Sequence, residues 1–150
     1  MRISTFLFIV ISFSVSMEAM GQDFRSLREK AEKIVRTTSP NGKLVGKEEG
    51  DKQVSYLWGP KKADVVLTIF YGASEEEAVE RMNAMFKFLS VGPGKKRTGI
   101  GDEAYSWNDE RTGFAGIRFR KANVYVDLSA PSAAMAEDLA RELLRAIKKK

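Results

Sequence analysis

Residues Gly99 to Trp107 read GIGDEAYSW and hold the residue types that could do chemistry. Their opening fits G-x-G-x-x-A, the glycine pattern of a dinucleotide-binding turn, and the two acids and two aromatics would equally suit a metal or sugar site. A dinucleotide turn needs a strand before it and a helix opening within it, whereas here a helical pattern precedes and an alternating strand follows. Asp102 and Glu103 are adjacent, so in a strand they point to opposite faces and cannot cooperate. The stretch is therefore predicted to begin a strand.

The absence of two residue types excludes several activities. The 150-residue chain contains neither histidine nor cysteine. It therefore has no Ser-His-Asp or Cys-His catalysis, no His-based zinc site and no c-type haem attachment of its own, and no disulfides. We expect no catalytic residue, metal site or cofactor. A hydrolase that uses a Ser-Lys pair or paired carboxylates stays open as an alternative.

Three further polar clusters lack the spacing of known sites. VGKEEGD (45–51) and NDERTG (108–113) do not provide the alternating oxygen ligands and distant Glu of a calcium loop, so both are predicted to be solvated turns. GPGKKRTG (92–99) is basic and glycine-rich but lacks the phosphate-loop pattern. A weak anion site there is the alternative to a plain loop.

The amino terminus has the pattern of a signal peptide. Arg2 is followed by an uncharged run from Ile3 to Met17, which is shorter than the roughly 20 residues that span a bilayer. Ala19-Met20-Gly21 offers small residues for cleavage. We predict a signal peptide over residues 1–21 and a single domain over 22–150, periplasmic or secreted, with no stable membrane span after cleavage.

The charge of the chain argues against a nucleic-acid partner. The net charge is +5, and three of these charges are the final Lys148 to Lys150. The remaining bases and acids are spread along the chain, whereas nucleic-acid binders concentrate a basic face.

Hydrophobic spacing predicts the order α-βββ-α-βββ-α. Apolar residues at helical spacing predict three helices, which begin near Phe24, Ser74 and Pro131. Ser74 and Glu77 have the spacing of a capping box. Alternating or continuous apolar runs predict six strands, at Lys43–Glu49, Gln53–Trp58, Asp64–Tyr71, Glu103–Trp107, Phe114–Arg120 and Val124–Ser129. The third run is apolar on both faces and is predicted to be central.

These elements predict an α+β domain. We expect a mainly antiparallel sheet of about six strands, with the last two helices on one face and the first helix at an edge or alongside. The aromatic spacing of SYLW (55–58) matches AYSW (104–107), and the segments that begin at Ala63 and Ala122 also resemble each other. A duplication of a βββα unit is one explanation. The other is that strand–turn–helix patterns resemble one another without common origin.

The last two strands predict a hairpin with one polar face. With Ala122-Asn123 as the turn, Phe119 faces Val126 and Ile117 faces Leu128. The opposite face then carries the hairpin strip, which pairs Arg120 with Tyr125 and Arg118 with Asp127.

Arginine and tyrosine are enriched in binding hot spots. We therefore take Arg118, Arg120 and Tyr125 as candidate ligand- or partner-binding residues. The alternative is that these residues only stabilise the sheet and bind nothing. Trp58 and Trp107 are weaker candidates, because a large aromatic residue at the end of a strand is more often part of a core.

The segment from Gly99 to Pro131 resembles a pattern of poorly characterised bacterial exported proteins and lipoproteins. The matching positions are Gly101 to Tyr105, a Gly-Asp-Glu-Ala-aromatic strand, and Arg120 to Asn123, an Arg-Lys-x-Asn end. The segment is also broadly similar to extracellular sensor-like domains of lipoproteins and membrane kinases. The resemblance covers about a quarter of the chain and departs from the lipoproteins in lacking a lipid-bearing Cys. It implies an exported binding-type domain and transfers no active site.

The sequence thus favours a non-enzymatic binding or interaction module whose partner is an envelope protein or a small ligand. The alternatives are the hydrolase described above and a structural component of an envelope complex. A pocket with two converging carboxylates would favour the hydrolase, and a broad apolar patch would favour the complex.

The mature protein is expected to begin near Gln22, because cleavage after Gly21 fits the small-residue pattern. Amino-terminal sequencing of the protein recovered outside the cytoplasm checks this. A membrane-bound, full-length product that begins at Met1 would contradict it.

Overall fold

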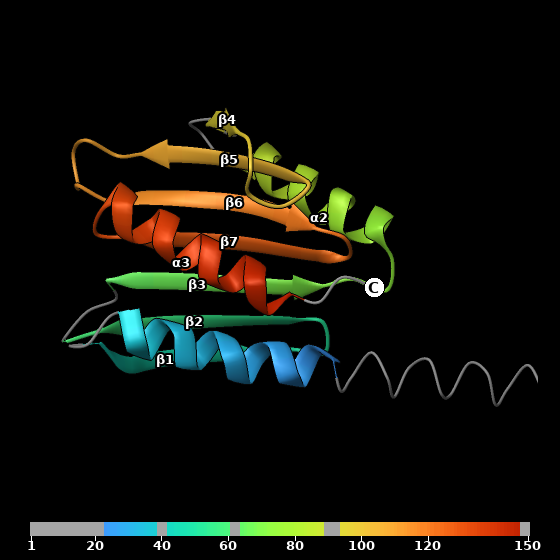
Figure 1. Cartoon of the computed structure of the whole chain (residues 1–150), viewed down its shortest axis with the longest axis horizontal. Coiled ribbons are helices and arrows are strands. Elements are labelled where there is room, and N and C mark those ends of the chain that lie inside the picture. Colours follow the sequence, from blue (N-terminus) through green and yellow to red (C-terminus); the bar gives the residue numbers. More distant parts are fainter. Residues whose placement is uncertain (1–22, 39–41, 61–63, 89–93, 148–150) are drawn as a thin grey trace, which may run out of the picture.

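The computed structural model describes residues 23–38, 42–60, 64–88 and 94–147, so the predicted leader lies outside the described part of the chain. Residues 23–38 are helical and are called the amino-terminal helix below. The elements that follow are shown in Figure 1 and are β1 (Lys43–Glu49), β2 (Gln53–Gly59), β3 (Val65–Tyr71), α2 (Glu75–Phe88), β4 (Lys95–Arg97), β5 (Glu103–Asn108), β6 (Ala115–Lys121), β7 (Val124–Ala130) and α3 (Ala133–Ala146).

The strands form one antiparallel sheet in the order β1-β2-β3-β7-β6-β5-β4. The predicted α+β class and antiparallel sheet are confirmed, and β3 is central, as its two apolar faces indicated. The expected count of about six strands is wrong, because Lys95–Arg97 of the basic loop forms the short edge strand β4 against β5. Three consecutive cations give no hydrophobic alternation, so this strand has no pattern from which to predict it.

The helices lie on both faces of the sheet. The first face carries Leu67, Phe119 and Val126 and is covered by the amino-terminal helix and α3, which both lie in front of the sheet in Figure 1. The second face carries the alternate side chains, among them Arg118 and Asp127, and is covered in part by α2, which lies behind.

Contacts of α2 establish this placement. The Arg81 guanidinium lies 5.8 Å from the ring centroid of Phe70, and the rings of Phe86 and Tyr105 meet edge to face at 5.1 Å. The prediction that the last two helices share one face is therefore wrong. An amphipathic stripe shows that a helix packs on a sheet, but the path of the loop before it decides on which face.

The opposite placement of α2 and α3 is not what a simple duplication would give. The central strands β3 and β7 are antiparallel, so a two-fold axis that relates them is perpendicular to the sheet. Rotation about such an axis keeps each helix on its original face. The strands of the two halves correspond, but the helices after them do not.

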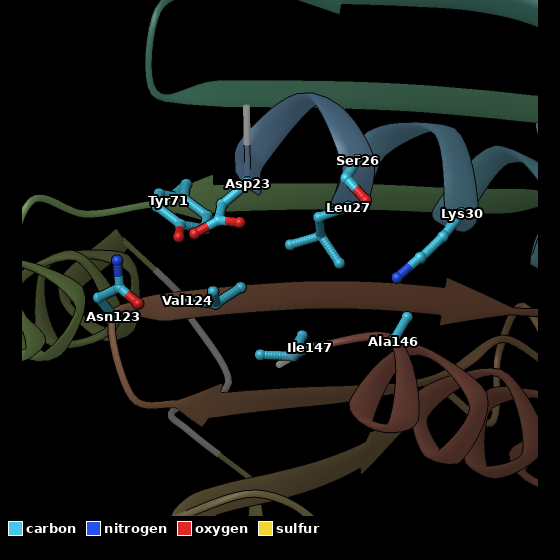
Figure 2. Close-up of a pocket in the computed structure, with 9 residues that line it drawn as sticks. All are labelled: Asp23, Ser26, Leu27, Lys30, Tyr71, Asn123, Val124, Ala146 and Ile147. Atoms are coloured by element: carbon cyan, nitrogen blue, oxygen red, sulfur yellow. The ribbon is translucent and has the colours of Figure 1, made fainter. Parts of the chain in front are cut away.

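The apolar core fills the first face. Leu139 and Leu143 of α3 and Ala31 and Val35 of the amino-terminal helix are fully buried there. Between the two helices lies a cavity of about 30 Å³, the size of about one water molecule. Figure 2 shows the residues around it: Asp23, Ser26, Leu27, Lys30, Tyr71, Asn123, Val124, Ala146 and Ile147. The interface between the amino-terminal helix and α3 therefore leaves little empty space.

The β6–β7 hairpin has the predicted register. Phe119 pairs with Val126, Ile117 with Leu128, Arg118 with Asp127 and Arg120 with Tyr125. The left-handed residue of the turn is Ala122, at φ 48°, rather than Asn123.

Asn123 instead ties the turn to the end of β3. Its side-chain Nδ2 donates to the carbonyl of Gly72 at 2.6 Å, and its own carbonyl accepts from the amide of Gly72 at 2.8 Å.

The chain enters β5 through a close backbone contact with β6. Gly101 has φ 64°, and a Cβ atom added there would lie 2.3 Å from the carbonyl oxygen of Arg120. The next amide, that of Asp102, donates to the same carbonyl at 2.8 Å. Glycine is needed at 101 both for its positive φ and for this approach.

Gly101→Ala is expected to lower the free energy of unfolding by about 3 kcal/mol or more, because it adds a backbone clash to the cost of positive φ. Gly99→Ala is the matched control, since Gly99 has φ 76° but open space around its Cβ position. It should cost only about 1 kcal/mol. Guanidinium unfolding of both variants measures the difference, and equal losses would contradict the clash.

Candidate functional site

The five predicted site residues lie in three environments. Trp58 is 1% exposed in the first-face core, where its ring stacks on Tyr56 with centroids 4.9 Å apart. Arg118, Arg120 and Tyr125 lie on the second face and are 5%, 8% and 1% exposed. Trp107 lies on the same second face and is partly buried. The structure brings Trp107 and Arg118 together and leaves Trp58 on the other side of the sheet.

The hairpin strip is buried rather than open to solvent. The α2 helix lies over this face, with its buried Ala78 and Met82 directed at the sheet. The strip is thus enclosed between a helix and a sheet. Isolated charges are rarely buried, but here the charges are paired.

Arg118 is held by one hydrogen bond. Its Nε donates to Oδ2 of Asp127 at 3.2 Å, and the two side chains are 6% and 19% exposed. Burial raises the pKa of Asp127 above its ordinary value, although the charge of Arg118 opposes this shift. Burial and the charge of Asp127 likewise raise the pKa of Tyr125. The Nη1 atom of Arg118 is buried and has no hydrogen-bond partner within the described ranges.

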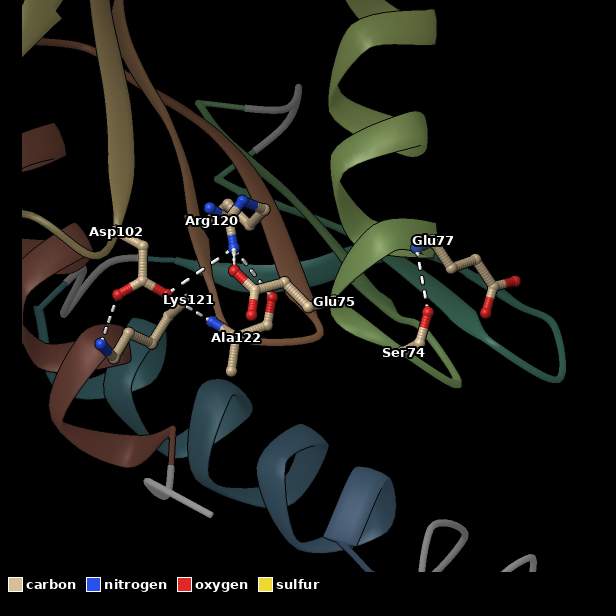
Figure 3. Close-up of polar contacts among 7 residues, drawn as sticks. All are labelled: Ser74, Glu75, Glu77, Asp102, Arg120, Lys121 and Ala122. Atoms are coloured by element: carbon tan, nitrogen blue, oxygen red, sulfur yellow. Dashed lines mark hydrogen bonds and ion pairs between the residues drawn. The ribbon is translucent and has the colours of Figure 1, made fainter.

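Arg120 joins the start of α2 to the β6–β7 turn. Its Nη1 contacts Oε1 of Glu75 at 2.6 Å, the carbonyl of Ala122 at 3.3 Å and Oδ2 of Asp102 at 3.7 Å (Figure 3). Ser74 caps the same helix end by accepting from the amide of Glu77 at 3.3 Å, which confirms the predicted cap. Glu77 in turn accepts from the amide of Ala73 at 2.6 Å.

Asp102 closes the turn from the other side. Its carboxylate accepts from the amide of Ala122 at 2.7 Å and from Nζ of Lys121 at 2.5 Å (Figure 3). Burial opposes ionisation of Asp102, but these two hydrogen bonds, with the charges of Lys121 and Arg120, outweigh it and hold its pKa below the ordinary value. The Gly-Asp and Arg-Lys-x-Asn segments thus contact each other, and their residues stabilise the fold.

A groove of about 680 Å³ lies where β5 runs past the short strand β4. Its lining residues come from β4, β5, the following turn and β6, and they are Gly94, Lys95, Ser106, Trp107, Asn108, Asp109, Glu110, Arg111 and Arg118. Volumes of about 300–1,000 Å³ are typical of small-ligand sites.

Trp107 and Arg118 are stacked in this groove. The guanidinium carbon of Arg118 lies 5.3 Å from the ring centroid of Trp107, a cation–π geometry. Gly116 of β6 pairs with Trp107 and makes room for its ring, because a Cβ atom there would lie 2.3 Å from Trp107 Nε1. The arginine is thereby fixed at Nε by Asp127 and on one side by Trp107.

The rim of the groove comes from two segments predicted to be loops. Asp109 lies in the predicted turn, where its Oδ1 accepts from the amide of Arg111 at 3.0 Å. A hydrogen bond from Thr112 together with the amides of the turn lowers the pKa of Asp109 despite the cost of burial. Lys95 comes from the basic loop for which a weak anion site was the alternative. Sequence reasoning missed Ser106, Asn108 and Arg111, because only the pairing of β4 with β5 places these segments together.

Within the described ranges, no cluster of three or more Asp or Glu side chains is arranged to hold a metal ion. The described helices are each too short or too polar to cross a bilayer.

Comparison with known protein families gives no match for this chain, and comparison with curated proteins gives none. The resemblance to exported lipoprotein and sensor-like domains therefore stays a prediction.

Asp102→Asn is expected to lower the free energy of unfolding at pH 7 by about 1 kcal/mol, the upper end for a partly exposed ion pair. Asparagine keeps an acceptor for the amide of Ala122 but loses the charge. Because folding depresses the pKa of Asp102, its stabilisation is present above the ordinary value of 3.8 and is lost as the pH falls further.

The difference between wild type and variant should thus shrink below pH 3.8, which guanidinium unfolding at several pH values measures. Glu48→Gln is the control, because Glu48 is exposed and makes no ion pair within the described part of the chain. A difference that stays constant through acid pH would contradict the role of the Asp102 charge.

Proposed function

We propose that this chain is an exported, non-enzymatic binding module whose ligand site is the groove at Trp107. The observation that carries the proposal is the arginine inside this groove. Arg118 is almost fully buried and stacked on an indole, yet Nη1 has no partner among the described residues. Arg118 lines a groove of small-ligand size beside a partly buried indole, and arginine and tryptophan are the residues enriched in binding hot spots.

The groove also combines the features that small-ligand sites share. It offers an aromatic surface at Trp107 and the polar turn residues Asp109, Glu110 and Arg111. Its basic groups Lys95 and Arg111 make no ion pair with another described residue, so they remain able to meet a ligand. A few polar groups around an aromatic surface fix the orientation of a ligand and give specificity.

The two carboxylates around Arg120 form a structural ion pair with it rather than a hydrolytic pair. Glu75 and Asp102 both approach Nη1 of Arg120, and Asp102 also contacts Lys121. A general acid requires a carboxyl whose pKa is raised towards neutrality. The pKa of Asp102 is shifted in the opposite direction, as suits a structural ion pair.

Export rests on the amino-terminal pattern alone. Arg2, the uncharged run and the small residues up to Gly21 support a cleaved signal peptide. The proposed ligand is accordingly one that the protein meets in the periplasm or outside the cell.

The protein is expected to retain a ligand from an envelope extract, and Trp107→Ala should retain at least about tenfold less, the loss expected at a binding hot spot. Mass spectrometry of proteins and small molecules recovered with each variant measures this. Phe88→Ala is the matched control, because Phe88 is an aromatic residue that is 85% exposed and outside the groove lining.

Retention by wild type and Phe88→Ala together with loss in Trp107→Ala supports the groove as the site. Equal retention by all three proteins would place recognition elsewhere. Release of a product that differs from the added compound would overturn the non-enzymatic assignment.

A further inference from the structure

We propose that strand β1 is an interface through which the protein pairs with a second copy of itself. The two copies join their β1 strands antiparallel about a two-fold axis, so that their sheets become continuous. Three features support this interface: the exposure of β1, the protection of the opposite edge and the placement of the charges on β1. The proposed ligand groove lies towards the opposite edge of the sheet, so ligand binding and pairing are independent.

Strand β1 forms one edge of the sheet and is open along its length (Figure 1). In the described part of the chain its one strand partner is β2, and every residue from Lys43 to Glu49 is exposed except the half-buried Gly46. Leu44 and Val45 are 41% and 47% exposed, and they are two of the three exposed large hydrophobic residues of the described ranges. An edge strand presents unpaired backbone N–H and C=O groups, which pair readily with another strand. The outer side of β1 can therefore receive a second strand.

The opposite edge of the sheet is built differently. Strand β4 has only three residues, Lys95, Lys96 and Arg97, and all three are cations. Short, positively charged edge strands are a common means by which proteins prevent pairing between sheets. Strand β1 has seven residues, and its outer edge has no such protection beyond the single bulge at Val45. Association through β1 leaves only protected edges and therefore stops at a dimer.

The bulge places two opposite charges of β1 on the same face of the sheet. Lys43 pairs with Gly59 of β2, and Glu48 pairs with Ser55. Because Gly59 and Ser55 are separated by an even number of positions, Lys43 and Glu48 both lie on the second face. Both side chains are exposed, and neither makes an ion pair within the described ranges. Each charge is thus left without an intramolecular counter-charge.

An antiparallel second copy brings these charges together. When Lys43 lies opposite Glu48 of the second copy, the two-fold axis also places Glu48 opposite Lys43 of that copy, so the dimer gains two cross-strand ion pairs. Leu44 and Lys47 share the first face and then lie opposite each other, so the aliphatic stem of the lysine covers part of the exposed leucine. No like charges of β1 face each other in this register. The strand is therefore complementary to itself.

Sedimentation velocity of the purified protein measures the association. We expect a monomer–dimer equilibrium with a dissociation constant below about 1 mM at low salt, the range of weak specific complexes. Lys43→Glu and Glu48→Lys should each weaken self-association at least about tenfold, because each places like charges opposite one another. An equimolar mixture of the two variants should associate as the wild type does, because every acid then meets a lysine.

Lys96→Glu is the matched control, because it makes the same change of charge as Lys43→Glu at an exposed position of the opposite edge. It should leave self-association unchanged. Circular dichroism of each variant, together with recovery of association in the mixture, shows that the variants fold. Guanidinium unfolding is measured in dilute solution, where so weak a pair is dissociated, so Glu48→Gln remains the control for Asp102.

Several results would overturn the inference. A protein that stays monomeric up to about 1 mM would remove the second copy as the partner of β1. Association that survives both charge reversals would place the contact on another surface. Equal weakening by Lys96→Glu, or folded variants that do not associate when mixed, would show an effect of net charge alone. The ligand groove is tested separately by the extract experiment, whichever of these results is found.

Discussion

The arrangement of the second face depends on the burial of two arginines between α2 and the sheet. Arg118 and Arg120 are 5% and 8% exposed, and a buried guanidinium without a counter-charge would cost several kcal/mol. Asp127 supplies that charge from the neighbouring strand, and Glu75 supplies it from the start of α2. Loss of Asp127 would leave Arg118 buried without its counter-charge, and loss of Glu75 would leave Arg120 with Asp102 at 3.7 Å as its remaining described counter-charge. The position of α2 and the pairing of the hairpin residues are therefore linked.

The two faces of the sheet are consequently stabilised by different forces. The first face is an apolar core in which Leu67, Phe119 and Leu139 are fully buried beneath two helices. The second face meets α2 through ion pairs, an edge-to-face ring contact and a narrow apolar stripe. Hydrophobic burial tolerates small shifts, whereas hydrogen-bonded charges require defined geometry. The polar interface therefore fixes α2 in a specific place.

The groove follows from the lengths of neighbouring strands. Strand β4 has three residues and β5 has six, so the last residues of β5 continue past their outer neighbour. Gly116 then makes room for the indole of Trp107, and Arg118 stands one step further along the same face. The arginine that the second face must bury thus also faces the space that the unequal strands leave.

Much of the local structure follows from the sequence alone. The alternation in Ala115–Lys121 and Val124–Ala130, joined by a two-residue turn, determines which residues pair, and the observed register is the predicted one. The cap at Ser74 and the interior position of β3 could also be predicted from the sequence, because caps and apolar runs depend on neighbouring residues. Only the tertiary structure decided three features: the face that α2 covers, the burial of Arg118 and Arg120, and the pairing of Lys95 with Ser106. They depend on loop paths and on pairings between segments far apart in the chain, and a pattern read along the sequence holds no information on which of two faces a helix will reach.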